Sequence, residues 1–85
     1  MNKLLKILME SEGSEFYIRR AHELIDISRK ASFFDVMRAG RRAKRGPEIA
    51  LGYVRANEEP VINPTDKAKL RRWTKTDGFI VLAEG

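Results

Sequence analysis

A helix-start signal and a helix-stop signal bracket one segment of this 85-residue chain, and together they constrain its fold more than any other feature. At the start, Ser32-Phe33-Phe34-Asp35 matches a capping box. In that motif Ser32 accepts a hydrogen bond from the first helical turn, and Asp35 reaches back to the backbone of Ser32. At the far end, Gly46-Pro47 stops a helix, because proline removes a donor and clashes with the preceding turn. The two signals predict a helix over residues 33–45.

The predicted helix has two unlike faces when its residues are placed about 100° apart. One face is apolar and consists of Phe33, Val36, Met37, Gly40 and Ala43. The opposite face carries the guanidinium groups of Arg38, Arg41, Arg42 and Arg45. Phe34 falls within the basic arc, and Lys44 lies nearer the apolar side, from which its long stem can carry the amine outward. We therefore expect one face to pack and the other to meet solvent or a partner.

The net charge of +5 is concentrated in the same part of the chain. Residues 1–37 carry six basic and six acidic residues, and residues 56–85 carry five of each. Residues 38–55 carry six basic residues against Glu48 alone. Exposed helix faces usually mix both signs, so this single-sign stripe indicates an anionic partner, with an ordinary solvated face as the alternative. Arginine suits such a partner, because its planar donors match phosphate oxygens and the acceptor edge of guanine.

The rest of the sequence predicts further short helices. One covers residues 3–10, and a second begins at Ser14 and fades around residues 27–30. Another begins at Asn63-Pro64, where asparagine caps and proline fits the first turn, and ends near Thr76. Residues 47–57 suit either a short helix or an extended segment.

Two short strands complete the prediction, at Val61-Ile62 and, after the turn signal Asp77-Gly78, at residues 79–82. The expected fold is mainly α, with four or five short helices and a small two-stranded sheet in a single domain over residues 1–85. This is an α+β arrangement that is compatible with a winged helix.

Composition removes several classes of function. The chain has no cysteine, which excludes disulfides and thiolate chemistry and favours a cytoplasmic protein. The longest apolar run, residues 79–83, is far shorter than the roughly 20 residues of a membrane span. His22 is the only histidine, and with Glu23 and Asp26 it suits a surface pair better than a metal site. We therefore expect no catalysis, no metal and no cofactor.

The segment Ala21-His22-Glu23-Leu24-Ile25-Asp26-Ile27-Ser28 resembles the first helix and turn of helix-turn-helix DNA-binding proteins. In that family a small residue is followed by leucine, a turn residue, an aliphatic residue and serine. The resemblance covers residues 21–45 and implies that the arginine-bearing helix reads DNA. Asp26 stands where the family usually has glycine, and the stronger cap at Ser32 lengthens the connection between the helices.

These observations predict a small nucleic-acid-binding protein, a DNA-binding regulator of transcription, with DNA favoured over RNA. The alternative is an adaptor or inhibitor that docks its arginine stripe on an acidic protein surface. A membrane partner is disfavoured, because only Phe34 supplies a bulky apolar group beside the basic stripe. Oligomeric state stays open, with a dimer allowed. The predicted contact residues are Arg38, Arg41, Arg42, Arg45, Lys44, Phe34, Arg71 and Arg72.

Overall fold

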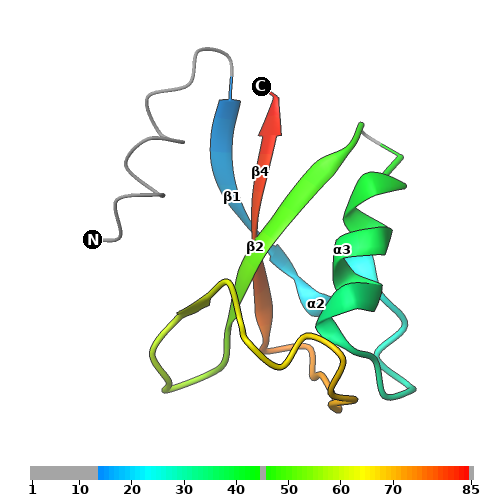
Figure 1. Ribbon diagram of the computed structural model, residues 1–85, viewed down its shortest axis with the longest axis vertical. Helices are drawn as coiled ribbons and strands as arrows, with labels where there is room; N and C mark the ends of the chain where they lie inside the picture. Colours follow the sequence, from blue (N-terminus) through cyan, green and yellow to red (C-terminus); the bar gives the residue numbers. More distant parts are fainter. Residues whose placement is uncertain (1–13, 45, 85) are drawn as a thin grey trace.

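The structure is a computed structural model that describes residues 14–44 and 46–84. Within these ranges the four strands form a single antiparallel sheet in the order β1-β4-β2-β3 (Figure 1). The elements, in chain order, are β1 (Ser14–Arg20), α2 (Ala21–Leu24), α3 (Phe33–Arg41), β2 (Glu48–Val54), β3 (Val61–Ile62) and β4 (Gly78–Glu84). The prediction of a mainly α fold with a two-stranded sheet is therefore wrong. The helix predicted over residues 3–10 lies outside the described residues.

Strand β1 occupies the start of the region for which a second helix was predicted. Its residues pair with β4 along the whole strand, from Ser14 opposite Glu84 to Arg20 opposite Gly78. The apolar residues of this segment fit both a helix and a strand, and pairing with a distant strand decides between them. The helical part is reduced to the single turn of α2, and the segment that resembles a helix-turn-helix has no long first helix.

The helix predicted from Asn63 to Thr76 is also absent, and we call this irregular segment loop 63–76. Asn63 adopts a left-handed backbone with φ of 50°, and its N–H donates to the carbonyl oxygen of Leu51 in β2 over 2.7 Å. Further along, Arg71 forms an isolated antiparallel bridge with Ala31. The backbone groups of this loop are thus partly satisfied by neighbouring segments and not by a helical ladder.

Helix α3 begins where the sequence predicts. Ser32 Oγ accepts from the N–H of Asp35 over 3.2 Å, and the N–H of Ser32 donates to Asp35 Oδ2 over 2.9 Å. The helix ends earlier than predicted, at Arg41, with Arg42 at its C-terminal cap. Gly40 brings α3 close to β2, since a Cβ at this position would lie 2.5 Å from the carbonyl oxygen of Glu48.

Four aromatic rings fill the core between the sheet and the helices. Trp73 is centred 4.9 Å from Phe79 and 5.2 Å from Tyr53, and Phe33 is centred 6.1 Å from Tyr53. The indole N–H of Trp73 donates to the carbonyl oxygen of Ala31 over 3.0 Å, which ties loop 63–76 to the segment that enters α3. Trp73 is only 1% exposed and therefore belongs to the core.

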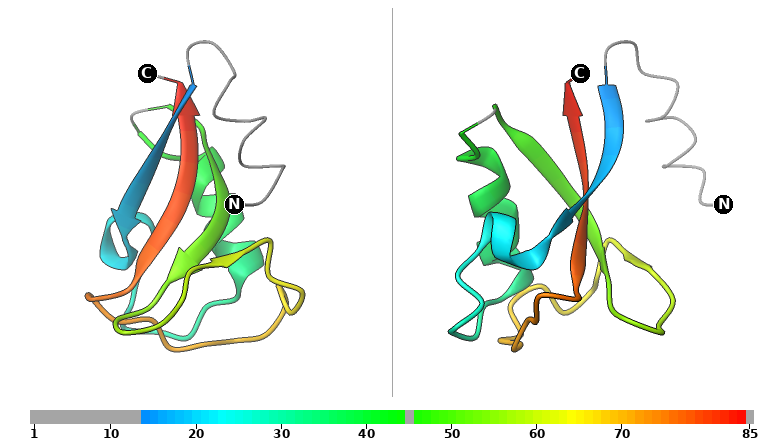
Figure 2. Two further views of the ribbon diagram at one scale, coloured as in Figure 1. Left: turned by 90° about the vertical axis from the view of Figure 1, so that its left-hand side faces the viewer. Right: turned by 180° about the vertical axis from the view of Figure 1, so that it is seen from behind.

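The two faces of the sheet differ in what covers them. Both helices pack on one face, which carries Phe79 and Val81 of β4 (Figure 2, left). Because side chains alternate along a strand, the residues between these positions point to the opposite face. There the paired strands align one row of Phe16, Leu82 and Ile49 and a second row of Ile18 and Ile80. We call the first the helix-covered face. We call the second the open face, because no helix of the described residues packs on it, although Leu82 in its central strand is buried.

Candidate functional site

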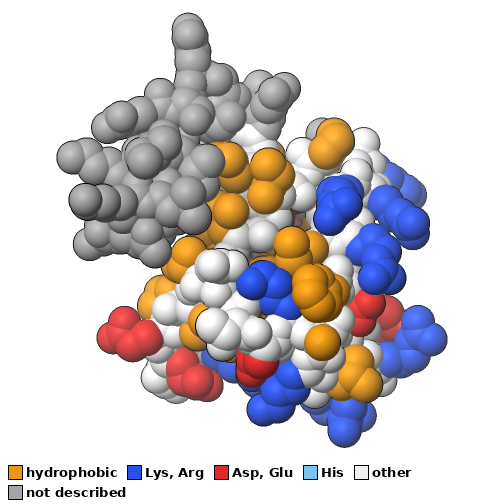
Figure 3. All heavy atoms as spheres, in the orientation of Figure 1, with side chains coloured by type: hydrophobic (Ala, Val, Ile, Leu, Met, Phe, Trp, Pro, Cys, Tyr) orange, Lys and Arg blue, Asp and Glu red, His pale blue; other side chains and the backbone are white. Residues whose placement is uncertain are grey.

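The basic stripe predicted from the sequence lies on α3 and just beyond its end. The side chains of Arg38, Arg41, Arg42 and Lys44 are exposed. Figure 3 shows Lys and Arg side chains gathered along the edge of the molecule that α3 forms. Arg45, which was predicted to complete the stripe, lies outside the described residues. Within the described chain the stripe therefore holds three arginines on the helix or its cap, and the exposed Lys44 follows them.

Loop 63–76 lies directly beside the start of α3. The N–H of Phe34 donates to the carbonyl oxygen of Lys67 over 3.1 Å, and Ala31 and Arg71 exchange backbone hydrogen bonds of 2.9 and 3.0 Å. Phe34 is 47% exposed and Leu70, in the loop, is 61% exposed. Two arginines of this loop were predicted to contact a partner. Arg72 is exposed, whereas Arg71 is partly buried and contacts residues of the protein itself.

Arg71 shows how the loop holds its shape. Its guanidinium forms an ion pair with Asp66 and lies over the ring of Tyr53, with 5.4 Å to the ring centroid. Lys67 donates through its amine to Asn63 Oδ1 over 2.8 Å and to the carbonyl oxygen of Pro64 over 2.6 Å. These contacts make Arg71 and Lys67 positioning residues for the loop and leave Lys69, Arg72 and Lys75 exposed.

A shallow groove of about 510 Å³ separates α2 from α3. Its walls carry both signs of charge, with Glu23 of α2 lining it together with Arg38 of α3 and Arg42 at the C-terminal cap of α3. Asp35 also lines it, and the N–H of Ser32 holds the pKa of that carboxyl below its usual range. The groove thus offers neither a uniform field for a charged ligand nor an enclosed apolar cavity.

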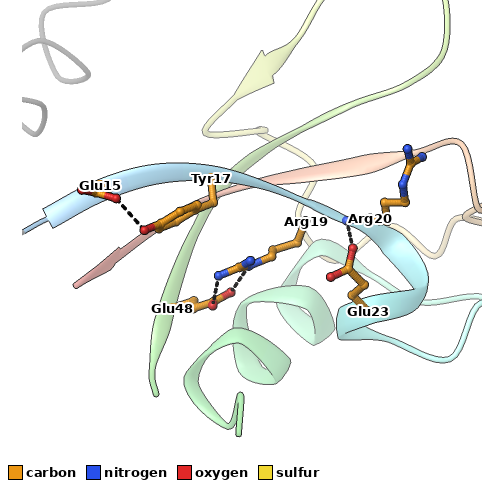
Figure 4. A network of polar contacts seen from close by, with 6 residues as sticks. All are labelled: Glu15, Tyr17, Arg19, Arg20, Glu23 and Glu48. Atoms are coloured by element: carbon orange, nitrogen blue, oxygen red, sulfur yellow. Dashed lines mark hydrogen bonds and ion pairs between the residues drawn. The ribbon is translucent and has the colours of Figure 1, made fainter. Parts of the chain in front are cut away.

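A second polar cluster lies on the helix-covered face of the sheet (Figure 4). Arg19 of β1 donates through Nε and Nη2 to the two carboxylate oxygens of Glu48 in β2, over 3.1 and 2.8 Å. The Glu48 side chain is only 2% exposed and that of Arg19 is 20% exposed. This bidentate contact raises the pKa of Arg19 above its ordinary value. The ring of Tyr17 lies 4.7 Å from the guanidinium carbon of Arg19.

Sequence reasoning missed this ion pair and also missed Arg55. The guanidinium of Arg55 lies over Trp73, with 4.7 Å to the ring centroid. Neither contact has a local signal, because each joins residues that are far apart in the chain. Both contacts tie separate elements together, and we assign them to stability and not to binding.

Residues 14–44 and 46–84 contain neither a candidate metal site nor a candidate membrane-spanning helix. In these ranges, His, Asp and Glu side chains form no group able to hold a metal ion. None of the helices described there has the length and apolar character needed to cross a membrane.

Comparison with known proteins gives a consistent result. The chain is 43% identical over 84 residues to the probable ion channel POLLUX of Arabidopsis thaliana, covering 98% of the chain and 10% of that relative. It is 38% identical over 86 residues to the ion channel DMI1 of Medicago truncatula, covering 100% of the chain and 9% of the relative. It is 38% identical over 85 residues to the ion channel CASTOR of Lotus japonicus, covering 99% of the chain and 10% of the relative.

The chain is homologous over its whole length to plant ion channels. It spans about a tenth of the length of the POLLUX, DMI1 and CASTOR proteins that it matches. No protein-family model matches it.

Homology to POLLUX, DMI1 and CASTOR overturns the functional predictions made from the sequence. The resemblance to helix-turn-helix proteins is wrong, and so are the predicted roles as a DNA-binding regulator of transcription and as an adaptor or inhibitor. The partner prediction, nucleic acid or an acidic protein surface and no membrane, is wrong for the same reason, because the homologues are named ion channels. The error has a physical origin: a stripe of arginines selects for negative charge but does not specify the molecule that carries it.

Proposed function

We propose that this chain serves as a folded module of an ion channel, outside the path of the ions. The observation that carries the proposal is the 43% identity to POLLUX across 98% of the chain. A match that runs from end to end favours a shared structural unit over a short common motif. The part of the chain that the structure describes is a sheet with two helices on one face, and its exposed edge is rich in Lys and Arg (Figures 1 and 3).

The proposed module works through contacts and performs no catalysis. Its most elaborate polar cluster, the Arg19–Glu48 pair, is nearly closed to solvent and joins two strands. His22, the one histidine, is exposed on the single turn of α2. We assign the module to the cytoplasmic side of the channel, since basic segments of membrane proteins are preferentially retained there.

A chimeric channel tests the proposal. The matching segment of the Lotus japonicus CASTOR channel is replaced by this chain, and single-channel currents are recorded in planar lipid bilayers. Two controls use the same position, a glycine-serine linker of equal length and this chain with Trp73→Ala, which removes the central ring of the core.

We expect the chimera that carries the native chain to conduct and both controls to lose current or assembly. If the native-chain chimera reaches the membrane in normal amounts but behaves like the linker control, the chain does not supply the channel module and the proposal is wrong.

A further inference from the structure

Folding places two basic segments side by side. Residues 33–44, which include α3, contact loop 63–76 through the Phe34–Lys67 hydrogen bond of 3.1 Å, and Ala31, just before this segment, forms a bridge with Arg71 of the loop. Together residues 33–44 and 63–76 carry nine basic and two acidic residues, whereas the rest of the chain carries eight basic and ten acidic residues. We call the surface of these two segments the basic face. The excess positive charge of the whole protein is collected there.

The two acids on the basic face do not neutralise it. Asp66 forms its ion pair with Arg71. Asp35 Oδ2 accepts a hydrogen bond from the N–H of Ser32, and Asp35 Oδ1 lies 3.7 Å from Nη1 of Arg38. In the part of the chain that the structure describes, the remaining exposed cations of this face make no ion pair, namely Arg41, Arg42, Lys44, Lys69, Arg72 and Lys75. Unpaired charges of one sign repel each other, so this face is more stable against an anionic surface than in water.

Two apolar side chains stand exposed in the same surface. Phe34 is 47% exposed in the first turn of α3 and Leu70 is 61% exposed in loop 63–76. Phe34 lies one turn before Arg38 and two turns before Arg41, so it shares their side of the helix. Large apolar groups set among cations are typical of surfaces that enter the boundary between lipid headgroups and acyl chains.

We infer that the basic face docks on the anionic surface of a lipid bilayer, with its cations on the headgroups and with Phe34 and Leu70 at the boundary to the acyl chains. This inference rests on the proposed function, because a module of an ion channel is held near a bilayer. Exposed Leu70 favours lipid over a nucleic acid, since an aliphatic side chain cannot stack on a base as an aromatic ring does.

Binding of the 85-residue chain to vesicles tests the inference. Vesicles of phosphatidylcholine alone are compared with vesicles that also contain phosphatidylserine, by co-sedimentation at low salt and at about 1 M salt, where charges are screened beyond roughly 3 Å. We expect binding only to the phosphatidylserine vesicles and only at low salt. Equal binding to both vesicle types, or none to either, overturns the inference, as does binding of duplex DNA without binding of vesicles.

A matched pair of variants locates the contact. Each basic residue near an anionic bilayer contributes about fivefold in affinity, so Arg41→Gln with Arg42→Gln should weaken vesicle binding about 25-fold. Arg20→Gln with Arg29→Gln removes the same charge from exposed positions outside the basic face and should leave at least half of the affinity. Arg20 points away from the Arg19–Glu48 cluster (Figure 4). Equal losses for the two pairs would show that net charge alone governs binding and would overturn the assigned face.

A second pair of substitutions tests the contribution of the exposed apolar side chains, Phe34 and Leu70, to vesicle binding. Phe34→Ser with Leu70→Ser should weaken vesicle binding and leave its salt dependence unchanged, because no charge is altered. Unchanged affinity would remove these two residues from the contact. Thermal unfolding by circular dichroism confirms that each variant is folded.

The channel chimera separates this inference from the proposed function. Current from the native-chain chimera without vesicle binding overturns the lipid contact alone. Vesicle binding without current in the chimera overturns the proposed function.

Discussion

The two faces of the sheet carry apolar residues in similar rows but differ in how deeply those residues are buried. On the helix-covered face, Phe79 and Val81 are fully buried beneath the helices and Trp73. On the open face, Leu82 of the central strand β4 is buried, whereas Ile18 and Ile49 of the flanking strands are 67% and 57% exposed. Buried apolar area is the main source of folding stability, so changes at Phe79 and Val81 should strongly affect folding, whereas changes at Ile18 and Ile49 should be tolerated.

Polar groups follow the same division. The helix-covered face includes a carboxylate, Glu48, that is nearly inaccessible to water and is therefore held by Arg19. A buried charge without a partner is costly, whereas an exposed apolar side chain costs little. Four sets of substitutions follow, from the largest expected effect to the smallest. Three test the difference between the faces, and the one at Asp35 tests how α3 is anchored over the helix-covered face.

Trp73→Ala should destabilise the protein by about 3–5 kcal/mol, because it leaves a cavity between Tyr53 and Phe79. Trp73→Phe keeps a ring but removes the donor to the carbonyl oxygen of Ala31, and it should cost clearly less. The free energy of unfolding of both variants is measured by urea unfolding followed by circular dichroism. Fluorescence is unsuitable, because both variants lack the only tryptophan. A loss below about 1 kcal/mol for Trp73→Ala would contradict the assignment of the core.

Glu48→Ala should cost about 3 kcal/mol, because Arg19 then keeps a partly buried charge without its carboxylate partner. Replacing both residues by methionine should cost less than Glu48→Ala alone, since neither charge is then left unpaired. The same unfolding measurement applies. If the double methionine variant is less stable than Glu48→Ala, the unpaired charge on Arg19 is not the cause of the stability that Glu48→Ala loses.

Asp35→Asn should cost about 1 kcal/mol at neutral pH, because it weakens the capping box that anchors α3. The hydrogen bond from Ser32 lowers the pKa of Asp35 in the folded protein. Its contribution is therefore fully present above the unfolded pKa of about 3.9 and is lost as the pH falls through the lower folded value. The difference in stability between wild type and variant should shrink below about pH 4, and a constant difference at every pH would contradict this account.

Ile18→Ser with Ile49→Ser should change the stability by no more than about 1 kcal/mol, because each side chain is more than half exposed. Val81→Ser is the matched change on the helix-covered face and should cost several times as much, since Val81 is fully buried. Equal losses at the two faces, read from urea unfolding midpoints, would show that the open face is part of the core.

Local signals in the sequence determined some elements of this protein correctly. The Ser32–Asp35 capping box sets the start of α3, and its hydrogen bonds lie within a single turn. The strand at Val61-Ile62 and the strand that follows Asp77 are also where the sequence predicts them. The basic residues of α3 are exposed as expected, because charged side chains on one face of a helix remain in water whatever the rest of the chain does.

Only tertiary structure decided the rest. Residues 14–20 and 63–76 have helical signals of their own, yet pairing with β4 makes the first a strand, and contacts to Ala31 and Leu51 keep the second irregular. The full extent of the basic face was likewise hidden, because residues 56–85 are neutral as a stretch of sequence and only Arg71 and Arg72 were predicted there as contact residues. Folding buries Asp77 and brings the cations of loop 63–76 beside α3. Which charges become neighbours depends on contacts between distant residues, and no local pattern records them.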